Sequence, residues 1–161
     1  MSLRIPPQAL FSRQPTAAGD TSPAAVGEPS HDRTLTSQEA LVYWLLRIAC
    51  GCEFIGHGAF GVITKAAWVP YFRVVGIRAH VAWELMPVVG SVDIFLGILV
   101  LLKPLRVVLL YYSVWGLWTA LLRPLSGEPV WELVERAPNY LVPLTLLYLR
   151  GLPRSWKELV Q

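Results

Sequence analysis

The stretch ELMPVVGSVDIFLGILVLL, residues 84–102, decides the fold because it is apolar almost throughout. Its apolar residues are continuous rather than alternating, which predicts a helix and not a strand. At about 1.5 Å per residue, this helix is long enough to cross the hydrocarbon core of a bilayer, which is about 30 Å thick. Pro87 is expected in the first turn, where proline is tolerated, and Lys103 and Pro104 are expected to end the helix.

Three further apolar runs, residues 41–63, 105–122 and 130–150, have a similar length. The composition agrees with membrane spans, since 54% of the 161 residues are apolar and only 16% are charged, with a mean hydropathy of +0.47. Soluble domains usually carry about 25% charged residues. The last run is cleanly apolar only over residues 140–149, so its helix must begin near residue 130 and carry charges at one end. The sequence therefore predicts an all-α fold, an integral membrane four-helix bundle over residues 37–151.

The segments outside these runs are polar. Residues 1–36 are rich in proline, serine, threonine and glycine and cannot bury enough apolar surface to fold, which predicts a disordered tail. Residues 64–82 mix large aromatic side chains with lysine and arginine, which predicts a short interfacial helix broken at Pro70. A re-entrant segment is the alternative for this stretch. Residues 152–161 form a short tail.

Four spans would place both termini on one side of the membrane. That side carries eight Lys and Arg residues against five on the other, which favours cytoplasmic termini by the positive-inside rule. The net charge of +3 does not indicate a nucleic-acid partner, because the basic residues lie singly beside apolar runs and form no stripe. The expected partner is the lipid bilayer.

Two short motifs in the first run have a packing explanation. Cys50 and Cys52 are two apart on a helix and point to nearly opposite sides, which predicts packing residues rather than a redox or metal pair. The sequence GHGAFG, residues 56–61, matches the dinucleotide fingerprint G-x-G-x-x-G. That fingerprint requires a preceding strand, so we interpret the glycines as sites where membrane helices approach closely.

Two acids inside the apolar runs are the main functional candidates. An ionisable group within a span is costly and marks a candidate functional site. Glu53 and Asp93 lie about 15 Å and about 13 Å from the same side of their runs, so they could meet near the middle of the membrane. Such a pair suits proton relay or hydrogen bonding to a quinone, although hydrogen bonds to neighbouring helices are an equally simple role. His57, four residues from Glu53, and Arg47 are possible partners.

Further polar residues are predicted to gather at one membrane face, as a charged rim over the acids or as lipid-headgroup contacts. Glu132 and Arg136 are four apart and are expected to pair. The spacing of the histidines and carboxylates matches no recognised metal-ligand pattern, so no metal site is predicted. Trp115 and Trp118 could flank a flat ligand or pack in the core. The rim candidates are His80, Glu84, Arg123, Glu132, Glu135, Arg136 and Asn139.

The runs resemble the DoxX and DoxX-like family of small four-helix bacterial membrane proteins. The first run carries Arg47, Gly51, Phe54 and Gly58 in the family's R-hydrophobic-x-x-G-x-x-F-x-x-x-G rhythm, and residues 123–139 are similar to the segment before the last helix. The resemblance covers about residues 38–151. It implies a multi-pass protein of the bacterial inner membrane and, from some relatives, a place in quinone-linked redox complexes.

The sequence contains no nucleophile triad, P-loop or convincing haem pair, so it does not decide between an enzyme and a non-catalytic subunit. The first hypothesis is a small subunit that binds a quinone or a similar apolar ligand in a membrane redox complex. A non-catalytic scaffold or assembly factor for other membrane or redox proteins is the second. A conduit for protons or small solutes is the third.

Overall fold

The computed structural model describes residues 4–5, 33–34, 36–153 and 155–160. Most of the tail predicted to be disordered, residues 1–36, lies outside the described residues. Within them, two-residue strands β1 (Arg4–Ile5) and β2 (Arg33–Thr34) pair antiparallel, with Arg4 opposite Thr34. The rest of the described chain is helical with short connections, which confirms the prediction of an all-α fold for the main body of the protein.

Helix α1 (Ser37–Val62) starts where the sequence predicts, because a capping box fixes its first turn. The Thr36 hydroxyl accepts a hydrogen bond from the backbone N–H of Glu39 at 3.3 Å, and the Glu39 carboxylate accepts one from the backbone N–H of Thr36 at 2.9 Å. Cys50 is buried and Cys52 is exposed, so the two thiols point to different sides as expected.

Helix α3 (Ala79–Leu102) begins five residues before the predicted position, and Pro87 lies inside it rather than in its first turn. A proline within a helix removes one backbone hydrogen bond and bends the chain, so it is a poor marker of a helix start. The segment before α3 forms a 3-10 turn, η1 (Ala66–Trp68), and helix α2 (Val69–Val74). Pro70 lies at the start of α2, where it begins the helix instead of breaking it.

Helix α4 (Arg106–Leu125) runs three residues beyond its predicted end. The single helix predicted over residues 130–150 is divided into α5 (Trp131–Glu135) and α6 (Ala137–Leu149), with Arg136 at the break. Pro138 lies at the start of α6 and has no backbone N–H to donate to the preceding turn, which explains the interruption. A last short helix, α7 (Trp156–Leu159), follows.

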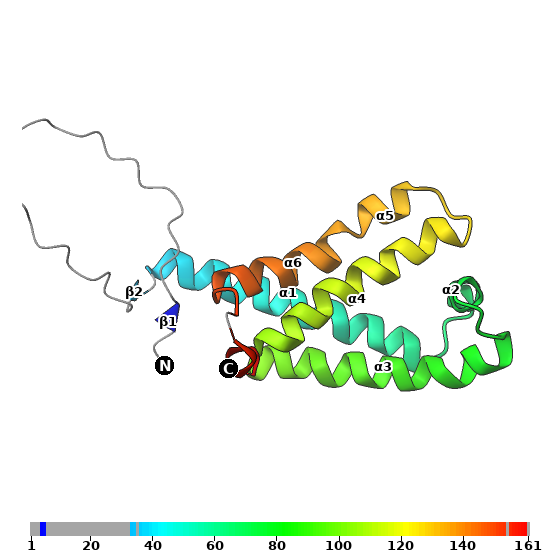
Figure 1. Ribbon diagram of the computed structural model, residues 1–161, viewed down its shortest axis with the longest axis horizontal. Helices are drawn as coiled ribbons and strands as arrows, with labels where there is room; N and C mark the ends of the chain where they lie inside the picture. The colour runs from blue at the N-terminus through cyan, green and yellow to red at the C-terminus, as the bar shows by residue number, and fades with distance from the viewer. Residues whose placement is uncertain (1–3, 6–32, 35, 154, 161) are drawn as a thin grey trace, which may run out of the picture.

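The long helices pack in two pairs, α1 with α3 and α4 with α6, and α1 also contacts α6. Helices α3 and α4 diverge from their tight junction, and α2 lies between their far ends (Figure 1). Glycines allow the close approach of α1 and α3, since a Cβ atom at Gly61 would lie 2.9 Å from the Cα of Gly90. Gly56, in contrast, faces open space.

The buried core lies toward the end of the molecule that holds the start of α1, the α3–α4 junction and α7. Its residues come from four helices and are Tyr43, Cys50, Phe54, Val100, Val108, Leu109, Tyr112, Leu146 and Leu147. Much apolar surface remains outside this core, and Leu41, Phe95 and Val114 are each 60–65% exposed. Helices α1 and α3 are long and apolar enough to cross a membrane, and only 33% and 28% of their most apolar segments are buried.

Candidate functional site

A cavity of about 430 Å³ lies in the half of the molecule away from the core, between α1, α3 and α4, with α2 over it. Its volume falls in the range of about 300–1,000 Å³ that is typical of small-molecule sites. Aromatic and aliphatic side chains form most of the wall, including Phe54, Trp68, Tyr71, Phe72, Val89, Trp115 and Trp118. The polar side chains in the wall are Glu53, His57, Asp93, Thr119, Arg123, Arg136 and Asn139.

Asp93 is the most deeply buried ionisable side chain of this wall, with 6% of its surface exposed. Its Oδ2 accepts a long hydrogen bond of 3.4 Å from the indole N–H of Trp115, which comes from α4. Its Oδ1 is buried and has no hydrogen-bond partner in the structure. The Tyr112 hydroxyl donates to the backbone carbonyl of Asp93 at 2.8 Å and holds α3 against α4 at this level. Asp93 therefore lines the cavity and carries one buried oxygen that has no partner among the described residues.

Glu53, His57 and Arg136 form a hydrogen-bonded chain on the other side. His57 Nδ1 lies 3.0 Å from Glu53 Oε1, and His57 Nε2 lies 3.4 Å from Arg136 Nη1. A guanidinium group only donates hydrogen bonds, so we assign Nε2 as the acceptor and place the imidazole proton on Nδ1, where it bonds to Glu53. The His57 ring also stacks on Trp68, with 5.6 Å between ring centroids, which fixes its orientation.

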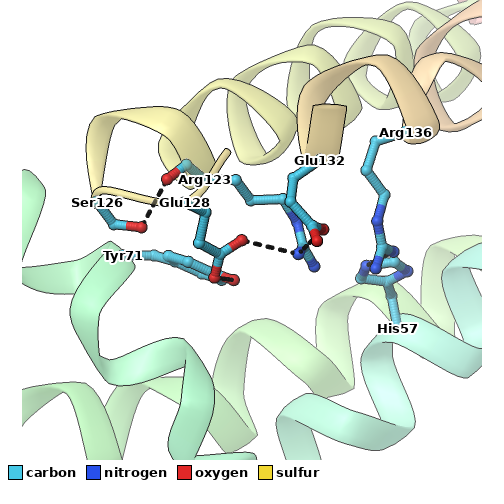
Figure 2. A network of polar contacts seen from close by, with 7 residues as sticks. All are labelled: His57, Tyr71, Arg123, Ser126, Glu128, Glu132 and Arg136. Atoms are coloured by element: carbon cyan, nitrogen blue, oxygen red, sulfur yellow. Dashed lines mark hydrogen bonds and ion pairs between the residues drawn. The ribbon is translucent and has the colours of Figure 1, made fainter. Parts of the chain in front are cut away.

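A second polar cluster joins α2 to α4 and α5 at the rim of the cavity (Figure 2). Arg123 Nη1 donates to Glu128 Oε2 at 3.1 Å and to Glu132 Oε2 at 2.9 Å. The Tyr71 hydroxyl donates to Glu128 Oε1 at 2.5 Å, and the Arg123 guanidinium lies 5.5 Å from the centre of the Tyr71 ring. Burial, together with the hydrogen bond to Glu128, raises the pKa of Tyr71 to about 12. We call Tyr71, Arg123, Glu128 and Glu132 the rim cluster.

The predicted pairing of Glu132 with Arg136 is wrong. Helix α5 ends at Glu135 and Arg136 lies in the break before α6, so the helical spacing that would join the two side chains is lost. Glu132 bonds to Arg123 and Arg136 turns to His57 instead.

The proposed role of Arg47 as a partner of Glu53 is also wrong. Arg47 is 3% exposed, and it donates to the backbone carbonyls of Val100 at 2.9 Å and Leu101 at 2.6 Å. These carbonyls belong to the last turn of α3, where helical partners are missing and a positive charge is favourable. Arg47 is therefore the C-terminal cap of a neighbouring helix.

The structure brings six of the predicted site residues to the cavity wall, namely Glu53, His57, Asp93, Arg123, Arg136 and Asn139. Glu53 and Asp93 share this cavity, but each has another partner and no hydrogen bond joins them. His80, Glu84 and Glu135 are exposed and lie outside the cavity. Tyr71 was missed as a site residue, and only its place between aromatic and basic neighbours pointed to it.

Metal chemistry has no support from the arrangement, since no group of three or more His, Cys, Asp or Glu side chains that could hold a metal ion occurs in the described part of the chain. Comparisons with known protein families, curated proteins and solved structures give no match. The site combines flat aromatic walls, one buried carboxyl group with an unpartnered oxygen, and a histidine that bonds to a second carboxyl group.

Proposed function

We propose that the chain is a multi-pass membrane protein whose four spans are α1, α3, α4 and the α5–α6 pair. The support comes from exposure. A core helix of a soluble protein is mostly buried, whereas only about a third of the apolar segments of α1 and α3 is buried. Lipid is the solvent that accepts such a surface. The positive-inside count favours cytoplasmic termini, and the DoxX-like resemblance suggests the inner membrane of a bacterium.

We propose further that the cavity binds a flat apolar ligand, with a quinone as the first candidate. The observation that carries this proposal is the unfilled Oδ1 of Asp93 in an aromatic cavity. A buried acceptor without a partner costs about 1–3 kcal/mol, so a polar group of a ligand is the natural partner. A carboxyl group donates when protonated and accepts when ionised, and it therefore suits both the carbonyl of a quinone and the hydroxyl of a quinol.

The role in a redox complex follows from the groups that the chain does contain. Reduction of a quinone to a quinol takes up two electrons and two protons. Asp93 and the Glu53–His57 pair are groups that can hold and pass protons, whereas the electrons would come from a partner redox protein. The chain would then be an accessory, ligand-binding subunit. A pure scaffold has no use for a cavity of this size with a buried carboxyl group in its wall.

The experiment is a titration of the purified protein in lipid nanodiscs with short-chain ubiquinone and menaquinone analogues, followed by quenching of its tryptophans. We expect saturable quenching that weakens about tenfold, equivalent to about 1.4 kcal/mol, in Asp93→Leu. Glu84→Leu is the matched control, because Glu84 lies on the same helix but is exposed and outside the cavity. Linear quenching that is equal in all three proteins would refute ligand binding in the cavity and favour the scaffold.

A further inference from the structure

A second buried polar atom without a partner among the described residues belongs to another residue that lines the cavity. The Nε of Arg136 is buried and has no hydrogen-bond partner, although the Nη1 of the same guanidinium contacts His57. Asp93 and Arg136 come from different elements, α3 and the break between α5 and α6, and both line the cavity. Two residues in the wall of one largely aromatic cavity therefore each carry a buried polar atom that a ligand could partner.

The two positions differ in what they accept. Arginine has donors and no acceptor, so the group that meets Arg136 must be an acceptor such as a carbonyl, hydroxyl or carboxylate oxygen. The carboxyl group of Asp93 takes either a donor or an acceptor, according to its protonation. The Oδ2 of Asp93 already holds the indole of Trp115, so only Oδ1 is left for a ligand.

We propose that the cavity recognises a flat aromatic ligand that carries an oxygen at each of two ends, one bonded to Asp93 and the other to Arg136. This inference rests on the proposed ligand-binding function and narrows it to one chemical class, of which para-quinones and their quinols are the simplest members. It disfavours fatty acids and other amphiphiles with a single polar end, because one of the two positions would stay unfilled. Cationic amines are disfavoured as well, because Arg136 repels them.

The test measures binding of three probes of equal ring size, 1,4-naphthoquinone, 1-naphthol and naphthalene, to the protein in nanodiscs. Probe concentrations are expressed per volume of lipid, so that partition of a probe into the bilayer is not counted as affinity for the protein. We expect affinity to fall by about tenfold for each oxygen removed from the probe, which corresponds to one lost hydrogen bond. Because this series is measured on the unaltered protein, it does not depend on whether any variant folds.

The protein side of the test uses Arg136→Met, with Arg73→Met as the matched control, since Arg73 is exposed and outside the cavity. Arg136→Met should weaken naphthoquinone about tenfold and leave naphthalene unchanged. The variant Asp93→Asn tests whether position 93 donates a hydrogen bond to the ligand. Trp115 should hold the amide oxygen, so the amide N–H₂ faces the ligand and donates only. This variant should keep its affinity for the quinone, whose carbonyl accepts from the amide, and a loss of about tenfold would contradict a hydrogen bond at this position.

The possible failures are distinct. Equal affinity for all three probes, with saturation, would overturn recognition at two ends while leaving an apolar ligand site in place. A dependence on one oxygen only, unaffected by Arg136→Met, would overturn the role of Arg136. No saturable binding of any probe would overturn both this inference and the proposed function.

Discussion

The two glycines Gly56 and Gly58 provide a direct test of how α1 packs against α3, because they belong to one short motif and have opposite surroundings. A Cβ atom added at Gly58 would lie 2.7 Å from Ile94 Cγ1 and 2.9 Å from the Ile94 backbone nitrogen, and it would also press on the Gly90 carbonyl oxygen. A Cβ atom at Gly56 would meet nothing within 4 Å. The substitutions Gly58→Ala and Gly56→Ala therefore add the same methyl group in a crowded and in an empty place.

The magnitude follows from these distances. Carbon atoms pack best at about 3.5–4.0 Å, so the two helices must separate by close to 1 Å at Gly58 to admit the methyl group. Overpacking of this kind typically destabilises a protein by about 1–3 kcal/mol. Both variants share the gain of about 1 kcal/mol from replacing glycine by alanine in a helix. The difference between the two variants removes this shared gain, so we expect Gly58→Ala to be less stable than Gly56→Ala by about 1–3 kcal/mol.

The assay is equilibrium unfolding in mixed micelles with a rising fraction of sodium dodecyl sulfate, followed by circular dichroism and tryptophan fluorescence. The two variants are compared with each other as well as with the unaltered protein, so that a general effect of alanine cancels. Equal stabilities for Gly56→Ala and Gly58→Ala would show that α1 and α3 do not meet at Gly58. That result would refute the packing explanation of the motif and the helix register that brings Glu53 and Asp93 to one cavity.

Two further predictions concern the polar contacts of Arg47 and Tyr71, and a third concerns the orientation of the chain in the membrane. Arg47→Met should lower the free energy of unfolding by about 2–4 kcal/mol, because it strips a charged cap from two carbonyls, and leave naphthoquinone affinity unchanged; a loss of affinity without a loss of stability would contradict the capping role. The pKa of Tyr71, about 12, exceeds the ordinary value of about 10, so its stabilising effect is complete below about pH 10 and is lost as the pH rises through 12. Thermal melts over this range should show a smaller alkaline loss in Tyr71→Phe than in the unaltered protein, and equal losses would show that the pKa of Tyr71 is not raised by folding. Green fluorescent protein fused after residue 161 should fluoresce and alkaline phosphatase fused after residue 65 should be active, whereas the reverse pattern would invert the proposed orientation.

The sequence predicts the parts of the site that depend on position along one helix. Glu53 and Asp93 are at similar depths in two apolar runs, and both line the cavity, although each bonds to another partner. The contacts that depend on the register between helices could not be predicted in this way. Arg47 caps carbonyls that lie 53 and 54 residues away in the chain, and this pairing is set by how α1 and α3 slide together on their glycines.

The residues before the last helix show a different limit. A helix through residues 130–150 would place Arg136 beside Glu132, and the break at Arg136 reverses that expectation. The break depends on whether Pro138 continues a helix with one missing hydrogen bond or starts a new one, and both outcomes are compatible with the local sequence. Pro87, which stays inside α3, shows that the same residue type has the opposite effect elsewhere in this chain.

The packed core and the cavity lie toward opposite ends of the protein. Arg47 and Arg106 satisfy the carbonyls at the ends of α3 and α6, and the tightly packed side chains lie toward that same end. At the other end the helices diverge, and α2 is tied to α4 and α5 by the rim cluster (Figure 2). Binding regions are drawn from the less stable parts of a structure. If the proposed ligand enters through the rim, only the contacts of the rim cluster need to break, and the arginine-capped end keeps α3 and α6 in place.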